Sequence, residues 1–281
     1  MSVISIQSQV VFGHVGNSAA IYPMIANGVA VQAVPTTLLS NIPGYPTLRG
    51  RVLPADLVAD LLLGVEERGL VTASRAMVTG YLGSVENAGA VKDFVLRAKK
   101  ENPQLTYICD PVIGDTDLGV FVADGLPEFF RRELVPLADI ITPNAFEFGL
   151  LAGLETYGAT AVAGALRRGV GGLPDQLAVT GAIPEDAPGF IDTLIAQGGK
   201  IWRIRTPKVD VRPHGTGDLF TGALTASLAR GQNFVAASEQ AVASVYDVLA
   251  SMPCGEAGEM PLAAQMAALR CQPRPFVAEP L

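Results

Sequence analysis

The chain has 281 residues, a formal net charge of −7 and a pI near 4.9, with 49% hydrophobic and 17% charged residues. This length and composition are those of a globular protein with a substantial core, which excludes a disordered chain or a mini-protein scaffold. An acidic chain without a basic stripe lacks the surface that tracks a phosphate backbone, which argues against nucleic acid as a partner.

The first two thirds of the chain alternate short β-branched runs with longer helical patterns. The runs predict strands at Val3–Gln7, Val29–Pro35, Ala76–Thr79, Thr106–Cys109, Asp139–Ile141 and Gln176–Val179. The helical patterns between them cover Asn17–Asn27, Pro54–Arg68 and Val85–Lys100, and a glycine follows each of the first two. This alternation is typical of a mostly parallel sheet covered by helices on both faces.

The pattern changes after Thr180. Gly189–Ile195 and Lys200–Arg205 look like strands and are joined through a Gln-Gly-Gly turn, which predicts an antiparallel hairpin. Helical patterns follow at Asp218–Ala229 and Phe234–Ser251. No linker, repeat or low-complexity tract divides the chain, so we expect one domain, residues 1–281. Its expected fold is a three-layer α/β/α sandwich with a central, mostly parallel sheet and antiparallel edge strands.

The cysteine pattern and the length of the apolar runs indicate the cellular location of the protein. Cys109, Cys254 and Cys271 are odd in number and lack CxxC spacing, which argues against a disulfide framework or a structural zinc site. No apolar run reaches the roughly 18 residues that a membrane span needs. The start of the chain also lacks the basic region of a signal peptide. We therefore expect a cytoplasmic protein with no membrane partner.

The strongest chemical signal is a Gly-rich string at the start of a predicted helix, made of Gly215, Thr216, Gly217 and Asp218. The glycines let the backbone approach a ligand, and the unpaired amides of a first helical turn form an anion site that could hold a transferring phosphoryl group. Asp218 would accept the proton of a hydroxyl group as its oxygen attacks phosphorus. The alternative is an ordinary loop with Asp218 as a helix cap.

Ligands of open α/β sheets bind at the carboxyl ends of the strands, so polar residues that follow strands are further candidates. Asp110 follows the strand Thr106–Cys109, and with Asp115 it could hold Mg²⁺ through oxygen or water ligands. A plain Asp-Pro turn is the simpler interpretation of Asp110 and Pro111. The sequence alone favours that simpler interpretation.

A second such segment follows the strand Asp139–Ile141. Asn144 and Glu147 have the spacing of a capping box, and Pro143 suits the first turn of a helix. The segment therefore predicts the start of a helix. A helix start does not exclude a contact between Glu147 and a magnesium-bound water.

The first predicted strand ends in Ser8, and a string of small residues from Gly13 to Ala20 follows. Small residues there could let a planar ligand lie against the backbone, with a hydrogen bond from Ser8. A strand-to-helix turn capped by Asn17 is equally compatible with this string. Tyr81, which follows the strand Ala76–Thr79, could form a wall for an aromatic ring or lie at an interface.

Together and in this order, the segments resemble the pyridoxal kinases of the ribokinase-like superfamily. The resemblance covers about Val3 to Ala250 and rests on the joint order of segments that are weak individually. Besides the segments above, those that carry it are Ser40-Asn41, Thr79-Gly80-Tyr81 and the run from Val135 to Asn144.

This resemblance implies transfer of the γ-phosphoryl group of ATP to the 5′-hydroxymethyl group of pyridoxal, giving pyridoxal 5′-phosphate. Pyridoxine and pyridoxamine are implied as further acceptors, Mg²⁺ and a monovalent cation such as K⁺ as cofactors, and a homodimer as the assembly. Asp218 is then the base, and the amides of Gly215, Thr216 and Gly217 form the anion hole.

The resemblance also assigns the ligand-facing residues of the remaining segments. The vitamin pocket would contain Ser8, Val15 and Tyr81, the magnesium and phosphates would lie near Asp110, Asp115 and Glu147, and the nucleotide would lie along Thr142, Asn144 and Thr180.

Two short strings depart from the family pattern. Gln9 stands where the family usually has histidine, and Ile42 and Pro43 stand where it usually has histidine and threonine. That threonine commonly contacts the vitamin, so Pro43 removes a donor and an acceptor from the expected pocket. Gly44 and Tyr45 keep the pattern. Vitamer preference and turnover stay open.

Three alternatives were compared with this interpretation. A hydroxymethylpyrimidine kinase has the same fold and a related acceptor, but its typical Gly-Ser-Asp and double-glycine opening is missing between Ser8 and Ala20. A sugar kinase would have early Gly-Gly and Asp signatures that this chain lacks. A protein that binds pyridoxal 5′-phosphate with little turnover would keep the same anion hole.

Overall fold

The computed structural model describes residues 1–155, 157–254, 258–271 and 275–281. Within this part of the chain the main sheet has ten strands, in the order β12-β11-β10-β9-β8-β5-β4-β1-β2-β3. The parallel strands are β1 (Ser2–Phe12), β2 (Ala30–Asn41), β4 (Ser74–Thr79), β5 (Thr106–Cys109), β8 (Ile140–Ile141) and β9 (Gln176–Ala182). The antiparallel strands are β3 (Gly50–Val52), β10 (Phe190–Gln197), β11 (Lys200–Pro207) and β12 (Glu279–Pro280).

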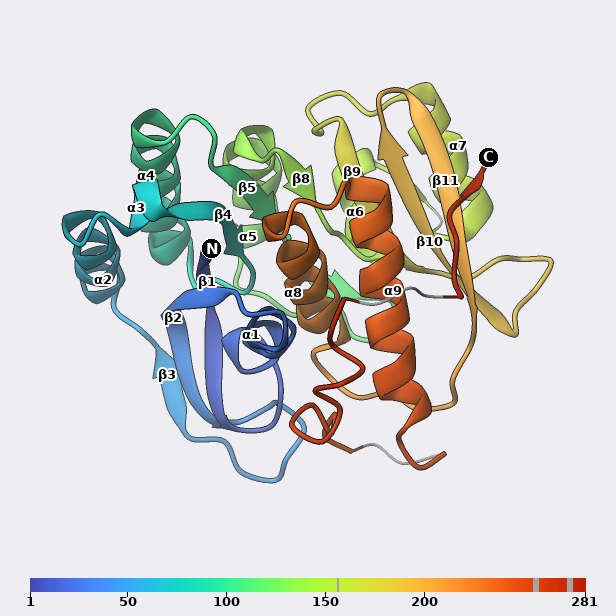
Figure 1. The fold of residues 1–281 in the computed structure, drawn as a ribbon, viewed down its shortest axis with the longest axis horizontal. Helices are drawn as coiled ribbons and strands as arrows, with labels where there is room; N and C mark the ends of the chain where they lie inside the picture. Colours follow the sequence, from blue (N-terminus) through green and yellow to red (C-terminus); the bar gives the residue numbers. More distant parts are fainter. Residues whose placement is uncertain (156, 255–257, 272–274) are drawn as a thin grey trace.

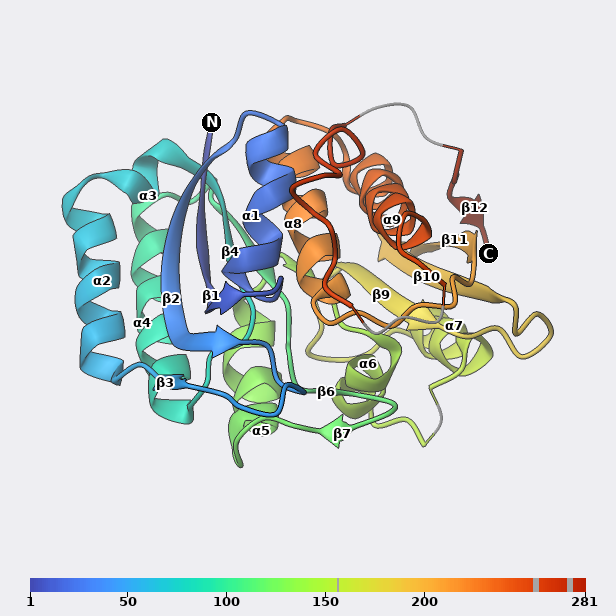
Figure 2. The same cartoon turned by 90° about the horizontal axis from the view of Figure 1, so that it is seen from below.

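Helices cover both faces of this sheet (Figures 1 and 2). One face carries α1 (Asn17–Ala26), α8 (Thr216–Ala229) and α9 (Phe234–Ala250). The other carries α2 (Ala55–Glu67), α3 (Leu70–Ala73), α4 (Val85–Glu101), α5 (Leu126–Phe129), α6 (Ala145–Ala152) and α7 (Ala159–Arg168), with a π-helical turn at Phe130–Leu134 and a 3₁₀ turn at Val135–Leu137. The three-layer sandwich expected from the sequence is confirmed.

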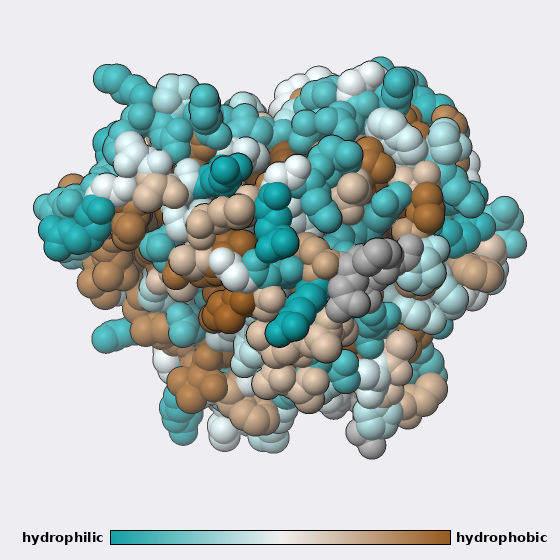
Figure 3. Space-filling model, viewed as in Figure 1, coloured by the Kyte–Doolittle hydropathy of each residue, from teal (hydrophilic) through white to brown (hydrophobic). Residues whose placement is uncertain are grey.

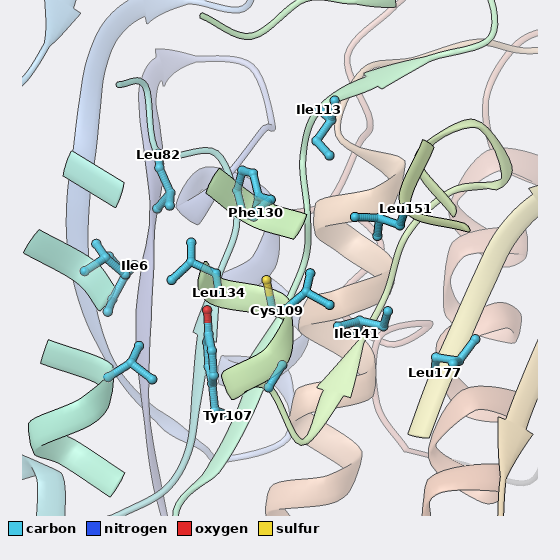
Figure 4. Close-up of a cluster of buried hydrophobic side chains, with 14 of the residues drawn as sticks. Ile6, Leu82, Tyr107, Cys109, Ile113, Phe130, Leu134, Ile141, Leu151 and Leu177 are labelled. Carbon is cyan, nitrogen blue, oxygen red and sulfur yellow. The ribbon is translucent and has the colours of Figure 1, made fainter. Parts of the chain in front are cut away.

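The central strands are buried on both faces, and alternate residues point to opposite cores. On β5, Tyr107 and Cys109 belong to the core under α2 to α7, whereas Ile108 belongs to the core under α1, α8 and α9. Figure 4 shows Tyr107 and Cys109 with Phe130 and Leu134 in the first of these cores. Each such large apolar side chain contributes roughly 1.5–3 kcal/mol on burial, which holds the central strands in place.

The predicted hairpin is confirmed. Strands β10 and β11 pair with Gln197 opposite Lys200, so Gly198 and Gly199 form a two-residue turn. Both glycines have positive φ, +60° and +71°, as a turn matching the strand twist requires.

The first two strands are longer than the sequence predicted. Strand β1 continues to Phe12 and pairs with β2 as far as Asn41, after a register shift between Gln7 and Gln9. Ser8 therefore lies at an irregularity inside β1, and the expectation that the strand ends at Ser8 is wrong. Val11, in this extension, is 91% exposed.

Several small elements were not predicted: β3, β12, helices α5 and α7, and a separate two-stranded sheet of β6 (Gly114–Asp115) and β7 (Gly119–Val120). In the described part of the chain, no helix combines the length and apolar character needed to cross a membrane. Figure 3 shows apolar side chains toward the edge occupied by α2, where Leu57, Leu61 and Leu63 are exposed.

Candidate active site

The predicted site residues gather at the carboxyl ends of neighbouring parallel strands. Asp110 directly follows β5, Thr142 follows β8, and Thr180 lies in β9. Asn144 forms a parallel bridge with Thr180, whose amide donates to the Pro143 carbonyl oxygen at 3.0 Å. The structure therefore brings Thr142, Asn144 and Thr180 to one edge of the sheet.

Helix α8 begins at this same edge, with Gly215 preceding it. Gly215 has a φ of +83°, and a Cβ atom there would lie 1.9 Å from the His14 carbonyl oxygen. Only glycine fits this position, because both the dihedral angle and the close approach exclude a side chain. The Gly-rich string is thus packed directly against the turn between β1 and α1, with Thr216 as the first residue of α8 and Asp218 in its first turn.

One glycine links Asp218 with Ser8. Gly16 has a φ of +53°, and a Cβ atom there would lie 2.4 Å from Ser8 Oγ. A backbone hydrogen bond joins Gly16 to the Asp218 carboxyl group. The predicted base and one predicted wall of the vitamin pocket therefore touch the same residue. Val15 lies in the same turn, and its carbonyl oxygen accepts from the Ser18 amide at 3.0 Å.

The environment of Asp218 changes its acidity. Surrounding protein atoms raise the pKa of Asp218 to about 6, and the Gly16 hydrogen bond offsets only part of this effect. The residue keeps partial exposure to solvent at the helix mouth. A carboxyl group with a pKa near 6 is ionised at neutral pH and basic enough to accept a proton.

Two more carboxyl groups lie under the same edge. Asp110 is 3% exposed and Glu147 4% exposed. Burial and the nearby charges of Glu147 and Asp218 hold the pKa of Asp110 well above its usual range. Burial raises the pKa of Glu147 to about 7. None of the ion pairs in the described part of the chain involves Asp110, Glu147 or Asp218.

Glu147 is held by backbone amides on both of its oxygens. Oε1 accepts from Ile113 at 2.9 Å and from Gly114 at 3.3 Å, and Oε2 accepts from Asn144 at 2.9 Å. Asn144 Oδ1 in turn accepts from the Glu147 amide at 2.9 Å, which confirms the predicted capping box at the start of α6. Glu147 thereby fastens the loop after β5 to the loop after β8.

The side chain of Asp115 is hydrogen-bonded within its own turn. Its Oδ1 accepts from the amides of Asp117 at 2.9 Å and Leu118 at 2.6 Å, which closes the turn between β6 and β7. Arg212, in the segment before the Gly-rich string, donates to Asp117 at 2.5 Å in an exposed ion pair. A direct contact of Asp115 with a metal stays a prediction.

The remaining predicted pocket residue is Tyr81, just after β4. Its side chain is half-buried, burial raises the pKa of its phenol, and its carbonyl oxygen accepts from Thr36 Oγ1 at 2.7 Å. The Tyr81 backbone is therefore fixed to β2.

The side chains at this edge fit a divalent cation whose coordination is completed by oxygen atoms of a bound ligand. Two buried carboxyl groups that repel each other are stabilised by a hard cation, which prefers oxygen. Among the described residues, no group of three or more His, Cys, Asp or Glu side chains is arranged to hold a metal alone. Mg²⁺ is commonly held by one or two carboxylates with phosphate oxygens and water. Asp110 would supply one carboxylate, and Glu147, whose oxygens accept from backbone amides, would act through water.

Two residues of this region were missed by the sequence interpretation. Thr221 donates to Asp110 Oδ2 at 2.9 Å, and its position three residues after Asp218, on the same helix face, was an available signal. Glu259 accepts from the His14 amide and from the Tyr45 hydroxyl, both at 3.1 Å. No local pattern marks Glu259, because both partners are more than two hundred residues away.

A carboxylate at the mouth of a helix, beside a Gly-rich string and two buried acids at the carboxyl edge of a parallel sheet, is the arrangement of a small-molecule kinase with the ribokinase-like fold. A family model described as phosphomethylpyrimidine kinase matches residues 53–263. Sequence relatives show which family within this class of kinases the chain belongs to.

The chain is 40% identical over 259 residues to a pyridoxine/pyridoxal/pyridoxamine kinase of Bordetella avium, covering 92% of this chain and 88% of that protein. It is 38% identical to a pyridoxal kinase PdxY of Leifsonia xyli, covering 89% of each. A pyridoxal kinase from Leishmania donovani in complex with ADP and pyridoxine superposes with a TM-score of 0.89 at 25% identity, covering 100% of this chain and 99% of that one. The chain belongs to the pyridoxal kinase family.

Proposed function

We propose that this kinase transfers the γ-phosphoryl group of ATP to the 5′-hydroxymethyl group of pyridoxal, with pyridoxine and pyridoxamine as further acceptors. The product would be pyridoxal 5′-phosphate, made in vitamin B6 salvage. The observation that carries the proposal is the contact of Gly16 with both Asp218 and Ser8, which supports a base close to the proposed ring pocket. The names of the sequence relatives support the same reaction.

In the proposed reaction, Asp218 accepts the proton of the 5′-hydroxyl group as its oxygen attacks the γ-phosphorus. The amides of Gly215, Thr216 and Gly217 donate to the transferring phosphoryl oxygens, and the dipole of α8 favours the same negative charge. The bond between the γ-phosphorus and the β–γ bridging oxygen breaks, and ADP leaves. Positioned general bases contribute typically 10²–10⁴-fold to such reactions.

The nucleotide is proposed to lie along Thr142, Asn144 and Thr180, which the structure brings to one edge. Asp110, and Glu147 through water, would hold Mg²⁺, with Asp115 near the phosphates. Mg²⁺, when bound, would neutralise negative charge on the phosphates of ATP. A monovalent cation such as K⁺ is proposed as a second cofactor from the family resemblance.

The vitamin ring is proposed to lie against Ser8, Val15 and Tyr81. The loop after β2 would form the opposite wall, where Ile42 is 6% exposed and Pro43 replaces the polar threonine usual in the family. Because proline offers neither the hydroxyl donor nor its acceptor, we expect backbone groups or water to contact that side of the ring.

We further propose one domain spanning residues 1–281, a homodimeric assembly and a cytoplasmic location. The first is supported by the continuous ten-stranded sheet of the described residues, whose strand β12 at the end of the chain pairs with β11. The homodimeric assembly follows from the family resemblance. The cytoplasmic location follows from the cysteine pattern.

A second candidate is phosphorylation of hydroxymethylpyrimidine, which the description of the matching family model favours. That acceptor also carries a hydroxymethyl group on a nitrogen heteroaromatic ring. A third is a protein that holds pyridoxal 5′-phosphate with little turnover.

A parallel turnover assay separates these functions. Purified protein with MgATP is given pyridoxal, pyridoxine, pyridoxamine or hydroxymethylpyrimidine, and the phosphate ester is measured. Pyridoxal should give the highest kcat/KM, and Asp218→Asn should lower kcat by roughly 10²–10⁴-fold while ATP binding is retained. Tight vitamin binding without product contradicts the kinase function, and faster turnover of hydroxymethylpyrimidine contradicts the proposed acceptor.

A further inference from the structure

A chain of three buried side chains connects the ends of two strands with helix α8. Thr221 Oγ1 lies 2.9 Å from Asp110 Oδ2 and 2.9 Å from Thr142 Oγ1. Thr221 is 1% exposed, and Asp110 and Thr142 are each 3% exposed. The three groups come from α8, from the residue after β5 and from the residue after β8.

The chemistry of the groups fixes the direction of these hydrogen bonds. Thr221 donates to the Asp110 carboxyl oxygen, and a hydroxyl group has a single proton. With Asp110 ionised, as it would be beside Mg²⁺, this leaves Thr142 as the donor to Thr221. In that state the hydroxyl proton of Thr142 is directed into the protein.

We propose that Thr221 is a positioning residue, which with Thr142 fixes the Asp110 carboxylate in the orientation that receives the magnesium nucleotide. Thr221 and Asp218 lie three residues apart on one face of α8, so a single rigid helix carries both the base and the donor that orients Asp110. The relative placement of the base and the phosphate-facing carboxylate is then set within one element. This inference rests on the proposed function.

The helix supplies a matched control. Thr225 is also fully buried on α8, and its hydroxyl donates to the Thr221 carbonyl oxygen at 2.7 Å. Thr225→Val removes a buried hydroxyl from the same helix without touching the Asp110 carboxylate. Thr221→Val removes the donor to Asp110, and Thr221→Ser keeps it.

The measurement is the affinity for ADP with and without Mg²⁺, determined by titration calorimetry, together with KM for ATP and for pyridoxal. Mg²⁺ increases the affinity for ADP, and this increase should be about tenfold smaller in Thr221→Val than in the wild type. A tenfold change is expected for one hydrogen bond to a charged group. Thr221→Val should raise KM for ATP and leave KM for pyridoxal within about twofold. Thr221→Ser and Thr225→Val should keep the magnesium-dependent gain, and the melting temperatures show whether each variant is folded.

An unchanged magnesium-dependent gain in Thr221→Val overturns the proposal. An equal loss in Thr225→Val also overturns it, because the effect would then reflect helix packing. Should Thr221→Val not fold, loss of the gain in Thr221→Ser overturns it and retention supports it, since the hydroxyl is the group proposed to act. Wild-type turnover is measured separately, so a failure of the kinase function is distinguished from a failure of Thr221 to position Asp110.

Discussion

Partial desolvation of the Asp218 carboxyl group by the surrounding protein has a consequence for the pH dependence of the reaction. The pKa of Asp218 is raised to about 6, so the group is protonated over a wider acidic range than a free aspartate. A protonated base cannot accept the hydroxyl proton. We therefore expect kcat/KM for pyridoxal to fall about tenfold per pH unit below pH 6 and to level off above it.

The control for this pH profile is Glu147→Gln. The pKa of Glu147 is also raised, to about 7, so its protonation could cause the same fall of kcat/KM at acidic pH. If protonation of Asp218 causes the fall of kcat/KM, the fall still begins near pH 6 in this variant. A wild-type kcat/KM that stays constant down to pH 4.5 would contradict the assignment of Asp218 as the base.

At the scale of the element, the start of α8 depends on the backbone of Gly215. Alanine there would carry the cost of a positive φ and would place its Cβ atom against the His14 carbonyl oxygen, so the first amides of the helix must move. We expect Gly215→Ala to lower kcat by roughly 100-fold, since displaced donors no longer face the transferring phosphoryl group. Steady-state kinetics with a thermal unfolding curve measure both effects.

Gly231→Ala is the matched control for this change. Gly231 follows α8 with a φ of +88°, and nothing lies within 4 Å of the position of its Cβ atom. The control therefore carries the cost of positive φ without the clash, and kcat should be kept. A kcat of Gly215→Ala within threefold of the wild type would mean that the string is not the anion site.

Elements with a strong local signal were predictable, and those defined by long-range pairing were not. The hairpin of β10 and β11 follows from two glycines between alternating strands, and the capping box of α6 from the spacing of Asn144 and Glu147. The extension of β1 past Ser8 was missed, because it depends on pairing with β2 and on a register shift. The sequence likewise did not show that three backbone amides occupy the Glu147 carboxylate.

At the scale of the whole molecule, the segment after α9 returns to the far end of β1. The carboxylate of Glu259 accepts from the His14 amide and from the Tyr45 hydroxyl, and the Tyr45 ring meets Phe12 edge-on at 5.8 Å. The neighbouring Gly44 lies close to His214, just before the Gly-rich string. Glu259 thus links the loop that contains Pro43 to the turn that contains His14, a contact invisible in any local stretch of sequence.

The contact between Tyr45 and Glu259 predicts a selective effect on the binding of the vitamin. Tyr45→Phe removes the hydroxyl group that donates to Glu259 and keeps the ring that contacts Phe12. The loop should then be held less firmly, so KM for pyridoxal should rise about threefold to tenfold, the range of one partly exposed hydrogen bond to a charged group. KM for ATP should not change, because the proposed nucleotide residues lie at the ends of β8 and β9.

Glu259→Ala and the double variant complete a thermodynamic cycle for this contact. If Tyr45 acts through Glu259, the double variant should show little more effect than the stronger single variant. Tyr246→Phe is the control, since Tyr246 lies on α9 and its ring contacts Phe276 far from the loop. Strictly additive effects on KM, or an equal rise in KM for ATP, would show that the contact does not support binding of the vitamin.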